Sequence, residues 1–120
     1  DCLVDIRDLP LSRKKGFSKN SLKENVESIG ISYSHMKSLG DPKEGRLAAR
    51  AGEHEKFVEI FSAHMKTDLA QEGLLELQGT VLTGRACLLC FEKNHEGCHR
   101  NIVVEELQKQ LKISVRHIQI

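Results

Sequence analysis

Short apolar runs alternate with stretches of helical periodicity along this 120-residue chain, and no other feature restricts the fold as much. Runs rich in β-branched residues predict strands at residues 2–6, 31–36, 86–91 and 113–120. Apolar residues recurring every three or four positions predict helices at residues 18–29, 53–66, 68–79 and 98–111. Strands that alternate with helices form mainly parallel sheets covered by helices. The sequence therefore predicts a three-layer, Rossmann-like α/β domain with helices on both faces of the sheet.

The length and charge of the chain limit the classes of protein to which it can belong. With 39% hydrophobic residues, we expect residues 1–120 to form a single α/β domain with a core of its own. The 18 basic and 17 acidic residues give a formal net charge of +1, which argues against a large nucleic-acid or membrane footprint. No apolar run is long enough to cross a bilayer, and no signal segment opens the chain. We expect a cytoplasmic protein that does not bind membranes.

Reactive side chains gather where the predicted strand at 86–91 ends. Glu92 follows this strand, and Cys98, His99 and Arg100 begin the next predicted helix. Open α/β sheets bind ligands at the carboxyl ends of their strands. A helix N-terminus and neighbouring positive charge favour the thiolate of a cysteine. We therefore expect Cys98 to be a nucleophile, with Glu92 or His99 transferring protons. The alternative is that Cys98 is a small, inert, buried residue.

Three arginines are expected at the same edge of the sheet, and they indicate the kind of ligand. Arg7, Arg13 and Arg100 follow or border predicted strands, and guanidinium groups bind phosphate and carboxylate bidentately. The other candidate binding residues are Asp5, Ser12 and Tyr33. The pattern predicts a site for a phosphorylated or otherwise anionic small molecule, such as a nucleotide, with no cofactor. The alternative for each arginine is an ion pair with a nearby acid.

Two other functions stay open. Zinc could be held by Cys90, His95, Cys98 and His99, which offer sulfur and nitrogen ligands. Cys87 and Cys90 do not suit a zinc pair, because residues three apart on a strand point to opposite faces. The short basic segment at 13–15 could instead serve a non-catalytic module that binds nucleic acid or protein, although a larger basic surface is usual for such modules.

The cysteines also bear on the expected chemistry. A domain of this size needs no disulfide for stability, so we expect all four cysteines to be free thiols. Cys2, Cys87 and Cys90 are expected to lie in the core rather than to react, because they fall on predicted strands.

A set of short segments in a fixed order adds a resemblance to a known family. The segments are Leu3 to Arg7, Pro10 to Arg13, Tyr33 to His35, Leu39-Gly40, Leu88 to Glu92, Cys98 to Arg100, and His117-Ile118. Together they resemble the family called domain of unknown function 488 over nearly the whole chain. The Cys-x-Glu and Cys-His-Arg blocks are the most specific part. The resemblance implies the fold and the place of the site, but no activity. It also implies a preceding strand and helix that this sequence lacks.

Overall fold

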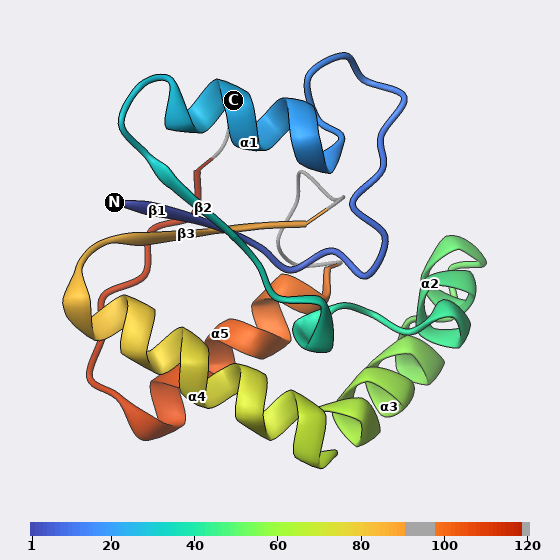
Figure 1. Ribbon diagram of the computed structural model, residues 1–120. Coiled ribbons are helices and arrows are strands. Elements are labelled where there is room, and N and C mark those ends of the chain that lie inside the picture. Colours follow the sequence, from blue (N-terminus) through green and yellow to red (C-terminus); the bar gives the residue numbers. More distant parts are fainter. Residues whose placement is uncertain (91–97, 119–120) are drawn as a thin grey trace.

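The computed structural model of the protein describes residues 1–90 and 98–118, which form a parallel sheet surrounded by helices (Figure 1). The strands are β1 (Cys2–Asp5), β2 (Ser32–His35) and β3 (Ala86–Leu89). The α-helices are α1 (Lys19–Glu27), α2 (Lys43–Arg50), α3 (His54–Met65), α4 (Asp68–Thr83) and α5 (His99–Gln110). A short 3₁₀ helix, η1 (Lys37–Leu39), follows β2.

β1 is the central strand, and both of its neighbours run parallel to it in the order β2-β1-β3. Leu3 lies opposite Tyr33 on one side and Cys87 on the other. The pairing continues just beyond the strands, since Ile6 N donates to the carbonyl of Leu89 at 3.0 Å. Because parallel strands end at the same edge, the chain leaves all three strands close together, at the edge where the sequence places its site.

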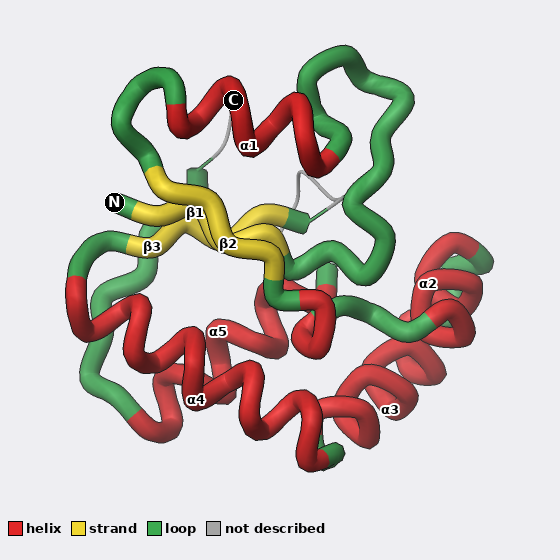
Figure 2. Tube along the Cα trace, in the orientation of Figure 1, coloured by secondary structure: helices red, strands yellow, loops and turns green. Residues whose placement is uncertain are grey.

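Helices cover both faces of the sheet, as Figures 1 and 2 show. α1 lies on one face, and α4 and α5 lie on the other. The core is densest on the side of α4 and α5, where Val4 of the central strand and Ile6 just after it are fully buried with Phe61, Leu74 and Val103. The predicted α/β fold, with a parallel sheet between two helical layers, is confirmed.

The helical pattern locates most helices well. In α3, the helical spacing puts Phe57, Val58, Phe61 and Met65 on one stripe, and all but the half-buried Val58 are buried. Residues 43–50 form a further helix, α2, in a segment of small and charged residues that also suits a loop. The first helix was predicted to reach Ile29, but α1 ends at Glu27, and the side chain of Ile29 beyond it is 73% exposed.

The end of α4 and the last predicted strand differ from the sequence analysis. α4 begins at Asp68, and the hydroxyl of its N-cap residue Thr67 accepts a hydrogen bond from Ala70 N. Gly79 does not end α4, which continues to Thr83, because one glycine weakens a helix by only about 1 kcal/mol. Residues 113–118, predicted as a strand, have no regular structure, and none of the described strands pairs with them. Residues 119–120 of that prediction lie outside the described range.

Candidate functional site

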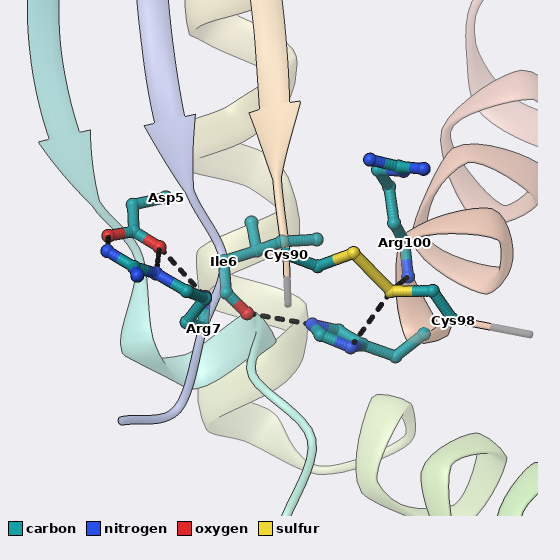
Figure 3. The surroundings of a disulfide bond; sticks show 7 residues. Asp5, Ile6, Arg7, Cys90, Cys98 and Arg100 are labelled. Atoms are coloured by element: carbon teal, nitrogen blue, oxygen red, sulfur yellow. Dashed lines mark hydrogen bonds and ion pairs between the residues drawn. A yellow bond between two sulfur atoms is a disulfide. The ribbon is translucent and has the colours of Figure 1, made fainter. Parts of the chain in front are cut away.

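The carboxyl edge of the sheet brings together the end of β1, the end of β3 and the start of α5. A hydrogen bond joins the end of β1 to the start of α5: His99 Nε2 lies 2.8 Å from the carbonyl oxygen of Ile6 (Figure 3). Cys90 follows β3 directly, and Cys98 occupies the N-cap position of α5. Residues distant in sequence therefore meet at the predicted edge.

Two groups of α5 lie next to the sulfur of Cys98. Its Sγ accepts a hydrogen bond from Arg100 N at 3.4 Å, so it lies at the positive end of the α5 dipole. His99 Nδ1 lies 3.6 Å from the same sulfur. A carbonyl oxygen can only accept, so the bond to Ile6 assigns the imidazole proton to Nε2. The lone pair of Nδ1 therefore faces Cys98.

Burial keeps His99 neutral. The imidazole is 6% exposed and packs edge-on against the ring of Phe61, with 5.2 Å between ring centroids. Burial lowers the pKa of His99 to about 4, and the positive charge of Arg100 adds to this, against the bond to Ile6. Near neutral pH, Nδ1 is therefore an acceptor.

Cys90 and Cys98 are joined by a disulfide bond, which corrects the prediction that all four cysteines are free thiols (Figure 3). The two residues are separated by eight positions in the sequence, and their side chains meet because β3 ends beside the start of α5. Cys2 and Cys87 are free. Cys87 was expected in the core, but it is exposed, whereas Cys90 is buried as expected.

The side chain of Arg7 is buried and forms its hydrogen bonds inside the protein. Its guanidinium is 2% exposed, donates to both carboxylate oxygens of Asp5 at 2.7 and 2.6 Å, and donates to the carbonyl of Phe17 at 2.7 Å. Tyr33 donates to Asp5 at 2.5 Å. Burial alone would raise the pKa of Asp5, but these bonds outweigh it and lower the pKa. Figure 3 shows Arg7 turned toward Asp5 and away from the disulfide. For Arg7, the ion-pair alternative describes the structure.

The remaining predicted residues are spread more widely. Arg100 is half-buried, with its backbone amide next to the sulfur of Cys98 and its side chain pointing away from the disulfide (Figure 3). Arg13 is exposed in the loop after β1, and Ser12 in the same loop exchanges hydrogen bonds with Ser18. Glu92 and His95 lie outside the described residues. The predicted joint role of these side chains around one ligand stays a prediction.

Another acidic group near this edge was missed by the sequence analysis. Asp8, after β1, forms an ion pair with Arg46 of α2 at 2.5 Å, and Arg46 also donates to the backbone carbonyl of Asp41. The Asp41 side chain is 6% exposed, and burial raises its pKa to about 7. In the sequence, Asp41 stands between Gly40 and Pro42, as an exposed turn residue would. No signal in the sequence distinguishes it from an exposed turn residue, since its burial depends on α2 packing over it.

Comparison with known protein families gives one match. The family described as Domain of unknown function DUF488 matches residues 1–107. The chain belongs to the DUF488 family. This confirms the resemblance noted from the Cys-x-Glu and Cys-His-Arg blocks, and it assigns no activity. No curated protein and no solved structure matches the chain.

Metal sites and membrane-spanning helices are two further features that bear on function. Within residues 1–90 and 98–118, no group of three or more His, Cys, Asp or Glu side chains is arranged to hold a metal ion. The zinc hypothesis includes His95, which lies outside these ranges, so it stays open as an alternative. None of the described helices combines the length and apolar character that crossing a bilayer requires.

Proposed function

We propose that this DUF488 domain binds a small anionic molecule at the carboxyl edge of its sheet and acts on it through the thiol of Cys98. The observation that carries the proposal is the position of Cys98 Sγ, which accepts the Arg100 amide hydrogen and faces His99 Nδ1. The cytoplasm, where the sequence predicts the protein to work, keeps such thiols reduced.

The geometry supports a nucleophilic role for the reduced thiol. His99 holds its Nε2 proton on Ile6, so Nδ1 can accept the proton of Cys98. The resulting imidazolium would be stabilised by the thiolate beside it, and the α5 dipole and the Arg100 amide would stabilise the thiolate. In this arrangement Ile6 orients the base, as the third member of a catalytic triad does.

The anionic character of the substrate is supported by the side chains next to the sulfur. Arg100 lies two residues after Cys98 in the first turn of α5, where a guanidinium can bind an anion, and the amides of this turn favour negative charge. Arg7 is assigned a different role, because Asp5 neutralises it inside the protein. Arg13 and Glu92 stay candidates for contacts to the ligand.

Competing alkylation by iodoacetate and iodoacetamide tests both halves of the proposal. The two reagents react alike except that iodoacetate is an anion. After full reduction, peptide mass mapping gives the rate at each thiol, and exposed Cys87 is the reference within the same chain. We expect the iodoacetate-to-iodoacetamide rate ratio to be higher at Cys98 than at Cys87, and Arg100→Ala to remove this preference.

The thiol half has its own readout. Alkylation of Cys98 should reach half its maximal rate below about pH 8.5, where an unperturbed thiol ionises. His99→Gln keeps a donor for the Ile6 carbonyl but removes the base, so it should shift this midpoint upward. An unchanged midpoint would remove His99 from the mechanism. Equal reagent ratios at Cys98 and Cys87 would remove the anion site.

A further inference from the structure

The partner of Cys98 in the disulfide points to an activity for this site. We propose that Cys90 and Cys98 form a two-thiol centre that reduces a small hydroperoxide and is itself oxidised to the disulfide. The inference rests on the proposed nucleophilic role of Cys98, and it adds a substrate class and a second reacting residue. Its basis is the position of both sulfurs at one corner, where the end of β3 meets the first turn of α5.

The burial of the two residues determines the size of the substrate. Cys90 is 6% exposed and Cys98 is 4% exposed, whereas Cys87, the second residue of β3, is an exposed thiol. A protein disulfide must bring its own sulfur and backbone against the attacking thiol, which these burials prevent. Hydrogen peroxide and small organic hydroperoxides need only the space of a few atoms. The geometry therefore favours a hydroperoxide.

The surroundings of the two sulfurs assign their roles. Cys98 receives the Arg100 amide hydrogen and faces the lone pair of His99 Nδ1, so it is the sulfur that is held as a thiolate. Cys90 follows a strand rather than beginning a helix, and it lies within bonding distance of Cys98. Cys98 is thus the attacking residue, and Cys90 is the resolving residue.

The reaction balances in three steps. His99 Nδ1 takes the Cys98 proton, and the thiolate attacks the terminal oxygen of the hydroperoxide. A sulfur–oxygen bond forms, the oxygen–oxygen bond breaks, and the departing alkoxide or hydroxide takes the proton back from His99. Cys98 is then a sulfenic acid, and the hydroperoxide has become an alcohol or water. The Cys90 thiol attacks this sulfur and water leaves, which gives the disulfide. An external dithiol returns both residues to thiols through a mixed disulfide.

The test begins with fully reduced wild-type protein and one equivalent of hydrogen peroxide. Mass mapping over time should show the Cys90–Cys98 disulfide forming while Cys87 stays a thiol, with the oxidation of Cys98 about tenfold faster or more, as expected for an activated thiolate. With excess dithiothreitol, peroxide should be consumed catalytically. Because Cys87 is an internal reference, this comparison needs no variant.

Three variants give matched controls. Cys90→Ser should stop at the sulfenic acid of Cys98, which dimedone captures. Cys98→Ser should consume peroxide no faster than dithiothreitol alone, and Cys87→Ser should behave as wild type. Oxidation of Cys98 no faster than that of Cys87, or no catalytic consumption of peroxide, overturns the inference. If Cys98 nevertheless prefers iodoacetate and loses that preference in Arg100→Ala, the proposed function survives alone. If both alkylation and oxidation fail at Cys98, both proposals fall.

Discussion

Asp5 and Arg7 illustrate two possible roles for an arginine at the end of a strand. The guanidinium of Arg7 is satisfied by Asp5 and by the Phe17 carbonyl, and Tyr33 completes the bonding of the carboxylate. A buried ion pair with such bonds adds little net stability, but removing one partner leaves the other charge buried and uncompensated. The pair therefore holds the edge of the sheet in one arrangement, beside the thiol site.

This arrangement gives a prediction for single and double variants. Arg7→Ala and Asp5→Asn should each lower the free energy of unfolding by about 3–5 kcal/mol, because each breaks a buried pair. The apolar double variant Asp5→Leu/Arg7→Met should cost much less than the sum of the two. Tyr33→Phe is the control, since it removes one hydrogen bond, worth about 1–3 kcal/mol, and leaves the pair in place. Urea unfolding measures all four. If Arg7→Ala costs no more than Tyr33→Phe, the guanidinium is not a structural group.

Part of this site could be predicted from the sequence. Cys98 was expected at a helix start beside His99 and Arg100, and the structure places it at the N-cap of α5. The Asp5–Arg7 pair also had a signal, because residues two apart on a strand share a face. The disulfide between Cys90 and Cys98 had no such signal in the sequence. Its formation depends on how β3 and α5 pack, and sequence spacing does not report that distance.

The segments that leave β1 and β2 pack in direct contact. A Cβ placed on Gly40 would lie 2.5 Å from Asp8 N and 2.6 Å from Asp8 Cα. Gly40 has an extended backbone that any residue can adopt, with φ of −78°, so the contact with Asp8 rather than the backbone angle requires glycine. This contact sets the path of the chain from β2 into α2, and hence the position of Arg46 and Asp41.

Substitution of this glycine tests the contact. Gly40→Ala should destabilise the domain by about 1–3 kcal/mol, as overpacking does, because the atoms of Asp8 that it meets belong to the backbone. Gly84→Ala is a matched control outside the helices: its backbone is also extended, and nothing lies within 4 Å of an added Cβ. Thermal unfolding of the two variants separates crowding from a general effect of losing glycine. A Gly40→Ala protein as stable as Gly84→Ala would show that the two segments can move apart.

Among the helices and strands, the sequence predicts an element well where the same face of that element packs against the core along its whole length. α3 and α5 follow from their apolar spacing, since each lays one face on the core. The alternating segment at 113–118 shows the limit of this approach. A segment of alternating polar and apolar residues forms a strand only where a neighbouring strand pairs with it. In the described sheet β1 lies between β2 and β3, and none of these strands pairs with residues 113–118.

For the molecule as a whole, two buried groups act on stability in opposite directions between pH 4 and pH 7. The folded pKa of His99, about 4, is below the ordinary value of 6.5, so the unfolded chain binds more protons between these values and stability falls as pH falls. The folded pKa of Asp41, about 7, is above 3.8, so the folded protein binds more protons and stability falls as pH rises. Asp5, with a lowered pKa, loses its contribution only at pH values below this window.

The two effects should nearly cancel in the wild-type protein and separate in variants. In Asp41→Asn the opposing effect is gone, so its stability relative to wild type should increase from pH 4 to pH 7, by up to about 1.4 kcal/mol per pH unit. In His99→Gln the relative stability should change with the opposite sign, decreasing from pH 4 to pH 6.5. Urea unfolding at half-unit pH steps gives both differences, and each variant is the control for the other. A difference between Asp41→Asn and wild type that does not depend on pH would show that Asp41 titrates alike in the folded and unfolded protein, and its burial would then not restrict ionisation.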